Sequence, residues 1–238
     1  MTPERTEKLR DVLRRRQPDL TIIAEQVHKS RNLAALVRNA DAAGIGSIHT
    51  VIPKEGYRSH SGTALGSDRW VKRYNHPDFS TAFDAVKAQG MKVYAAHWSD
   101  RAIDYREADF TVPCAVLLGA EKNGISEEAA EAADEHIVIP MMGMVSSLNV
   151  STACGIVLTE AIYQRRAAGL YDHCRLSDEV MATTMFEWAN RDVANFCRER
   201  GLDYPPHTID GDIVDAPDWY RCVREGSVSM RDWSQEPV

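Results

Sequence analysis

Strand-like and helix-like segments alternate along most of this chain, and that alternation limits its fold more than any other feature. Short β-branched or apolar runs at residues 21–27, 47–52 and 114–118 alternate with segments such as 31–43, whose apolar residues have helical spacing. Strands that alternate with helices form parallel sheets, and a strand that is apolar throughout is buried on both faces. The sequence therefore predicts an α/β fold with a parallel sheet that helices cover on both faces.

The other elements follow from the same patterns. We expect further strands at residues 70–74, 92–98 and 136–140, and helices at residues 3–17, 79–88, 126–133, 148–168 and 177–200. Residues 202–238 contain four prolines and many aspartates and are expected to be irregular. The prediction has three parts: a basic N-terminal helix (1–17), an α/β body (18–169) and a helical and irregular C-terminal extension (170–238).

The overall charge gives little support to a general nucleic-acid binder, because such proteins are usually basic. The chain has 28 Lys and Arg against 35 Asp and Glu, a formal net charge of -7. The distribution is uneven, however, since residues 1–16 carry six basic and three acidic side chains. This helix is either a solvated face or an arm that contacts phosphates.

Cysteine usage and hydrophobic runs indicate the compartment. The five cysteines are widely spaced without a CxxC pair, which disfavours a disulfide framework or a zinc site. The N-terminus lacks the apolar core of a signal peptide, and no stretch approaches the roughly 20 apolar residues of a membrane span. We expect a cytoplasmic protein without a metal or a membrane partner.

Several common catalytic motifs are absent. The sequence holds no Walker A loop, no GxSxG elbow and no HExxH pair. The pair Gly44-Ile-Gly46 precedes a predicted strand, whereas a dinucleotide fingerprint follows one. A Rossmann dehydrogenase, a P-loop enzyme and a serine hydrolase are therefore poorly supported.

Three polar segments lie at the junctions of the predicted core elements. They are S-R-N-L followed by R-N-A within residues 30–40, L-L-G-A-E-K-N-G-I at 117–125, and I-V-I-P-M-M-G-M-V-S-S-L-N-V-S at 137–151. In order and spacing they resemble the three motifs of the SPOUT methyltransferases of the TrmH (SpoU) family. The resemblance covers about residues 18–168.

This resemblance implies a deep trefoil knot near the C-terminal part of the sheet, S-adenosylmethionine as the cofactor, and a homodimer formed through the knot region. The cofactor-binding positions that it implies are Ala96, Gly119, Ile139 and Leu148. Small and aliphatic side chains suit a flat adenine whose polar atoms the backbone meets. Ala96 stands where some relatives have a hydroxyl residue.

The resemblance also implies the polar residues of a ribose 2′-O-methylation site. They are Arg38, Asn32, Glu121, Ser147 and Asn149. A guanidinium is very hard to deprotonate, so we expect Arg38 to bind the target phosphate and polarise the hydroxyl, with the proton acceptor open. Asn32 would orient Arg38 or the ribose, Glu121 would fix a loop or the arginine, and Ser147 and Asn149 would cap the third-motif helix and contact the ribose.

Within the family, the segment before the first motif and the extension after the third are similar to enzymes that methylate guanosine 18 in the D-loop of tRNA. Ribosomal RNA or another tRNA position is an alternative substrate, and a non-catalytic RNA-binding protein is a further alternative. DNA lacks the 2′-hydroxyl and is not expected to react. The residues expected to bind RNA are Arg5, Arg10, Arg14, Arg15, Arg165 and Arg166.

Overall fold

The computed structural model describes residues 2–52, 69–120 and 123–233 of the chain. It divides into two compact units. We call residues 17–173 the α/β body, and residues 2–16 together with 174–233 the helical unit. Each unit is described by itself.

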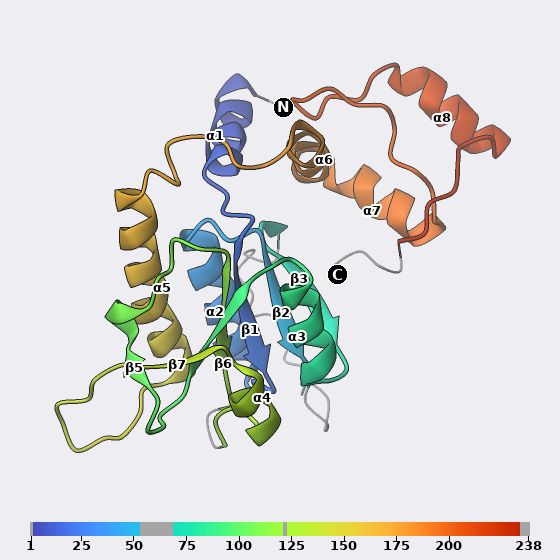
Figure 1. Cartoon of the computed structure of the whole chain (residues 1–238). Helices are drawn as coiled ribbons and strands as arrows, with labels where there is room; N and C mark the ends of the chain where they lie inside the picture. The colour runs from blue at the N-terminus through green and yellow to red at the C-terminus, as the bar shows by residue number, and fades with distance from the viewer. Residues whose placement is uncertain (1, 53–68, 121–122, 234–238) are drawn as a thin grey trace. The chain divides into compact units, whose positions relative to one another are not determined.

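A parallel sheet forms the centre of the α/β body (Figure 1). Among the described residues it has seven strands in the order β3-β2-β1-β6-β4-β7-β5. Their bounds are β1 Leu20–Glu25, β2 Ser47–Val51, β3 Lys72–His76, β4 Lys92–Ala96, β5 Ile103–Asp104, β6 Cys114–Leu118 and β7 Glu135–Val138. The pairing is parallel throughout, as predicted. The two-residue strand β5 was not predicted, because two residues show no periodicity.

Helices cover both faces of this sheet. On one face, α2 (Ser30–Ala42) and α5 (Val150–Ala167) contribute apolar side chains to one buried cluster. On the other face, α3 (Phe79–Lys87) and α4 (Glu127–Ala132) contribute to a second cluster. The strands β1 and β6 are buried along their whole length, which agrees with the apolar sequence of β6 and with the mainly apolar one of β1, where Thr21 and Glu25 are buried as well. The predicted α/β fold class is therefore confirmed.

Some strands that follow each other in the sequence are not neighbours in the sheet. Strand β6 lies between β1 and β4, and β7 lies between β4 and β5, so the chain crosses back into the sheet twice. A short 3-10 helix, Tyr105–Glu107, follows β5. The trefoil knot concerns how the chain threads through these crossings and stays a prediction.

Four helices make up most of the described helical unit: α1 (Pro3–Arg14), α6 (Asp178–Ala189), α7 (Arg191–Arg200) and α8 (Ala216–Glu225). Two expectations were wrong here. The single helix expected at 177–200 breaks at Asn190, whose side-chain amide donates to the carbonyl of Gly211. The stretch expected to be irregular contains α8. Its Pro217 does not prevent the helix, because it lies in the first turn, where a missing N–H costs little.

Candidate active site

The carboxyl ends of parallel strands meet at one edge of a sheet, and ligands of open α/β proteins bind outside that edge. In this body, all three motif segments leave from it. The first motif follows β1, the second follows β6 and the third follows β7. The topology therefore brings together segments that are about 100 residues apart in the sequence.

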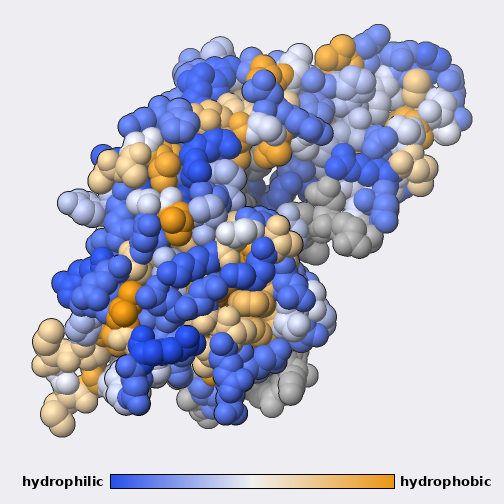
Figure 2. All heavy atoms as spheres, viewed as in Figure 1, coloured by the Kyte–Doolittle hydropathy of each residue, from blue (hydrophilic) through white to orange (hydrophobic). Residues whose placement is uncertain are grey.

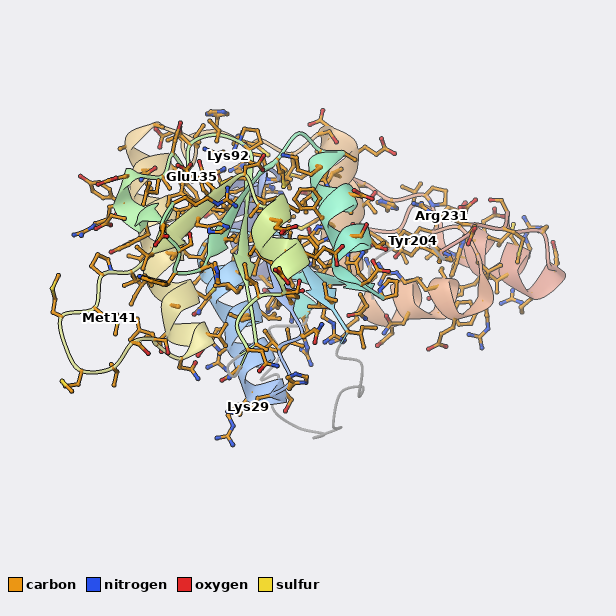
Figure 3. The ribbon with its side chains drawn as sticks, turned by 60° about the horizontal axis from the view of Figure 1, so that its bottom comes forward. Lys29, Lys92, Glu135, Met141, Tyr204 and Arg231 are labelled. Carbon is orange, nitrogen blue, oxygen red and sulfur yellow. The ribbon has the colours of Figure 1, made fainter. Side chains whose placement is uncertain are left out.

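A cavity of about 420 Å³ lies at this edge. Its walls come from the ends of β4, β6 and β7 and from the start of α5. Ala96, Gly119, Ile139 and Leu148, the four residues expected to bind the cofactor, all line it. Met141, labelled in Figure 3, also lines it, where the chain leaves β7 for the loop that leads to α5.

The two ends of the second motif pack closely together because Gly119 has no side chain. A Cβ at this position would overlap the backbone of Gly124 and Ile125. The loop is closed by two hydrogen bonds, since the amide N of Ala120 lies 2.9 Å from the carbonyl O of Gly124, and the reverse pair is 2.8 Å apart. A bare backbone is thereby presented to the cavity, which a planar ligand with polar edges can approach closely.

The cavity lining fits an adenosyl cofactor. Its volume is within the range of small-molecule sites. Leu118, Ile139, Val150 and Val157 give it aliphatic walls, and polar residues such as Asn123, Ser146 and Ser147 also line it. The residues present therefore agree with S-adenosylmethionine as the occupant.

Two predicted polar residues meet at the start of α5. Asn149 is its N-cap, and its Oδ1 accepts from the amide N of Ser151 at 2.9 Å. Its Nδ2 lies 3.5 Å from Oδ1 of Asn32, which is buried in the first turns of α2. The expected cap is thus Asn149, whereas Ser147 precedes the cap, is exposed and lines the cavity.

The same helix pair contains Asn39, a residue of the first motif for which the sequence predicted no role. Nδ2 of Asn39 donates to the carbonyl of Ser151 at 2.8 Å, and the amide lies next to Gly155 of α5. Asn39 is seven residues after Asn32, so both side chains share one face of α2. The spacing of seven residues could have identified Asn39 as a second polar residue beside Asn32. The two amides hold α2 against the first turns of α5.

Arg38 lies on a different side of α2 from this amide pair. Its side chain is exposed, and six residues separate it from Asn32, about 9 Å along the helix axis. Glu121, the fifth predicted polar residue, lies outside the described residues. The structure therefore brings together Asn32 and Asn149, and it leaves Arg38 accessible to a ligand from solvent.

The titratable groups beside the cavity favour neutral side chains. Burial lowers the pKa of His97, and nearby His136 and Arg101 lower it further, so His97 is neutral at pH 7. Burial raises the pKa of Cys154 to about 12, so this thiol on α5 is not a nucleophile. Among the described side chains no three His, Cys, Asp or Glu residues are grouped as metal ligands.

The comparisons with known proteins agree with this geometry. The model of the SpoU rRNA Methylase family matches residues 19–159, and the model of the C-terminal region of SpoU rRNA methylases matches residues 163–216. This chain belongs to the SpoU methylase family. No helix in the described parts of this SpoU methylase is long and apolar enough to cross a membrane.

Two curated relatives match most of this SpoU methylase. The tRNA (guanosine(18)-2′-O)-methyltransferase of Escherichia coli is 41% identical over 94% of this chain and 99% of its own length. The protein with the same function name from Thermus thermophilus is 47% identical over 80% of this chain and 98% of its own length.

Two solved structures are also similar. The TrmH/SpoU tRNA modifying enzyme of A. aeolicus superposes with a TM-score of 0.74 and is 37% identical, over 80% of this chain and 97% of that one. The AdoMet-bound rRNA methyltransferase of Sinorhizobium meliloti has a TM-score of 0.50 at 30% identity, over 67% of this chain and 60% of that one.

The basic residues expected to contact RNA in this SpoU methylase fall into distinct environments. Arg5, Arg14 and Arg15 on α1 and Arg166 on α5 are exposed. Arg10 is partly buried and forms ion pairs with Glu7 and with Asp210 of the C-terminal extension. Its charge is therefore already balanced within the helical unit.

Arg165 does not suit RNA binding at all, and that prediction was wrong. The side chain has no exposed surface. Its Nη1 lies 2.7 Å from Oδ1 of Asp19, and the guanidinium also donates to Oε1 of Gln17 and to the carbonyls of Asp19, Phe110 and Val112. The buried guanidinium thus links the C-terminal end of α5 to residues 17–19 and 110–112, whereas the N-terminal end of α5 lines the cavity.

Proposed function

We propose that this chain transfers a methyl group from S-adenosylmethionine to the ribose 2′-oxygen of guanosine 18 in tRNA. The observation that carries the proposal is the cavity at the carboxyl edge, which the ends of three strands and the start of α5 line together. The functions of the Escherichia coli and Thermus thermophilus relatives support the substrate, because their similarity extends over at least 80% of the chain.

The bound cofactor would supply a methyl group on a sulfonium, which an oxygen nucleophile attacks in line. The protein has to hold the ribose at the cavity mouth, exclude water and assist loss of the hydroxyl proton. Ala96, Gly119, Ile139 and Leu148 would hold the adenosyl group. Ser147, exposed at the wall, and the Asn32–Asn149 amide pair would contact the ribose or keep the wall in place.

Arg38 would bind the phosphate next to the target ribose and polarise its hydroxyl. The first turn of α2 contains no acidic residue, and Lys29 and Arg31 are exposed near its beginning (Lys29 in Figure 3). Cations at a helix N-terminus oppose the helix dipole, whereas a bound phosphate is favoured both by the dipole and by the cations. Helix α2 therefore suits an RNA backbone as its ligand.

The decisive assay uses the full chain, labelled S-adenosylmethionine and tRNA transcribed without modifications. A 2′-O-methyl group blocks alkaline cleavage after its nucleotide, so we expect one protected position, guanosine 18. A transcript with 2′-deoxyguanosine at that position is the matched control and should remain unlabelled. Label at another nucleotide, or in ribosomal RNA alone, would refute the proposed substrate, and no label in any RNA would favour the non-catalytic alternative.

The role of Arg38 is tested by the variants Arg38→Ala and Arg38→Lys. Loss of a group that orients a reacting hydroxyl should lower kcat on the order of 100-fold for Arg38→Ala, with the Kd for the cofactor unchanged. Lysine keeps the charge without the fork of donors and should retain part of the activity. Full activity in Arg38→Ala would refute the assignment.

The apolar loop that follows β7 supports a homodimer. Met142, Met144 and Val145 are largely exposed there, and Tyr163 is 71% exposed on α5 of the same unit. In Figure 2 this loop projects at the lower left of the view as a group of mainly apolar residues. We infer that a second copy covers them. Analytical ultracentrifugation should give a dimer, and Met144→Asp should shift it toward monomer. A monomeric wild type contradicts the inference.

The division of labour along the chain is part of the proposal. Residues 18–169 would carry out methyl transfer, and the basic N-terminal helix (1–17) and the C-terminal extension (170–238) would help to hold tRNA. The exposed Arg5, Arg14, Arg15 and Arg166 would contact its phosphates. A tRNA substrate supports a cytoplasmic enzyme.

A further inference from the structure

An aromatic side chain at the cavity has no packing role that explains it. Trp98 follows β4 by two residues and lines the cavity, yet it is 77% exposed. A single exposed apolar residue needs no explanation in general. Trp98 differs because it stands at the edge of the proposed reaction site.

The backbone on both sides of Trp98 is fixed. The amide N of His97 lies 3.2 Å from the carbonyl O of Ile137, which continues the pairing of β4 with β7. The ring of His97 packs edge-on against His136 at a centroid distance of 5.1 Å. On the other side, Oγ of Ser99 lies 2.7 Å from Nδ1 of His136.

Arg101 completes this support. Its Nη2 donates to the carbonyl of Ala130 at 2.7 Å and to that of Ala133 at 3.2 Å, at the end of α4. The amide of Ala102 donates to the carbonyl of Ser99 at 3.0 Å, which closes a turn. Residues 97–102 are therefore tied to β7 and α4, while the indole itself extends into solvent on a fixed backbone.

We propose that Trp98 is the platform on which the base of the target nucleotide stacks. This inference rests on the proposed function and identifies a residue that selects and positions its substrate. The adenosyl group would fill the cavity, and the indole of Trp98, which is 77% exposed at its wall, leaves most of its surface free for a second ligand. The nucleotide whose 2′-oxygen enters the cavity mouth brings its base to the same place.

The chemistry of the two rings fits. Proteins that read single-stranded RNA stack unpaired bases on aromatic side chains, and such a contact changes affinity by roughly 5-fold to 100-fold. A purine offers more overlap with an indole than a pyrimidine does. An aromatic ring on a fixed backbone also loses little conformational entropy when a base covers it.

The test combines two changes that remove the same contact from opposite sides. Trp98→Leu keeps an apolar side chain without the flat ring, and Trp98→Phe keeps a smaller ring. On the RNA side, a tRNA with an abasic ribose at position 18 keeps the 2′-hydroxyl but has no base. Phe83→Leu is the matched control, because it removes a partly exposed aromatic ring from α3 of the same body, and this ring does not line the cavity.

We expect Trp98→Leu to lower kcat/KM for intact tRNA at least tenfold, Trp98→Phe to lower it less, and Phe83→Leu to change it less than twofold. The Kd for S-adenosylmethionine should stay within twofold, which also shows that the cavity is folded. On abasic tRNA the wild type and Trp98→Leu should react at equal rates, because the contact is already absent.

Two results would overturn the stacking role while the proposed function stands. One is an active wild type whose Trp98→Leu variant loses the same factor on abasic and intact tRNA. The other is a Trp98→Leu variant that binds S-adenosylmethionine more than tenfold more weakly, which would make the indole a cofactor contact. A wild type that leaves guanosine 18 unmethylated in intact tRNA would instead refute both.

Discussion

The buried guanidinium of Arg165 permits a stability prediction with a built-in control. In Arg165→Met, an unbranched apolar chain replaces the stem but donates no hydrogen bonds. The carboxylate of Asp19 then loses its ion pair, and Gln17 and three backbone carbonyls lose a donor. Breaking a buried ion pair by removing one partner costs roughly 3–5 kcal/mol.

The magnitude follows from how far water can replace the lost donors. The side chain of Asp19 is 17% exposed, so this carboxylate regains part of its hydration, whereas the site of Arg165 itself has no contact with solvent. The carbonyl O of Asp19 keeps a donor in the amide N of Cys114, so the broken ion pair accounts for most of the loss. We therefore expect about 4 kcal/mol for Arg165→Met, or roughly 8–16 °C in Tm for a chain of this size.

The control lies one residue further along the same helix. Arg166 is exposed in the last turn of α5, and Arg166→Met should change the unfolding free energy by no more than about 0.5 kcal/mol. Urea unfolding followed by far-UV circular dichroism measures both variants. The Kd for tRNA should show the reverse pattern, because Arg166→Met should weaken tRNA binding and folded Arg165→Met should not.

An outcome in which the two variants have equal stability would refute the reasoning. It would mean that the guanidinium contributes no more inside the body than at the surface. Asp19→Asn added to Arg165→Met should recover part of the loss, because the double variant no longer buries an unpaired charge. A double variant that is less stable than Arg165→Met would refute the ion pair as the cause.

Three further predictions concern the cavity, strand β2 and the N-terminal helix. Gly119→Ala should weaken S-adenosylmethionine binding at least tenfold by calorimetry, because its methyl group overlaps the facing backbone. Gly46→Ala adds a methyl group in open space before β2, away from the cavity, and should leave this binding unchanged. Burial is the main reason why the pKa of His49 falls to about 4. Between pH 6.5 and pH 4, the imidazole is therefore protonated in the unfolded state and neutral in the folded state. Stability should fall by roughly 3 kcal/mol from pH 6.5 to 4, and the urea midpoint of His49→Leu should depend less on pH. Removing Arg14 and Arg15 should reduce the slope of log Kd for tRNA against log salt by about one per lost phosphate contact, and an unchanged slope would show that α1 is only a solvated face.

The sequence was sufficient for the elements whose pattern is long enough to repeat. Apolar runs such as Cys114–Leu118 identified buried strands, and the parallel topology then required their carboxyl ends to meet. Residues as distant as Ala96 and Leu148 were assigned to one site by the resemblance to the SpoU family, and the parallel topology explains why they meet at one cavity. Short or locally ambiguous signals failed, as with β5, with the break at Asn190 and with α8, whose proline reads equally well as a helix start.

Arg165 shows which part of the error was avoidable. The apolar face of α5 is formed by residues 150, 154, 157, 158 and 161, and the next position with this spacing is 165. Periodicity therefore placed Arg165 toward the core and Arg166 toward solvent, although both were predicted to bind RNA. An arginine is rarely buried without a partner, and its partner Asp19 is 146 residues earlier in the chain. A basic residue that falls on an apolar helix face is thus better interpreted as evidence for a distant buried acid than as a contact for nucleic acid.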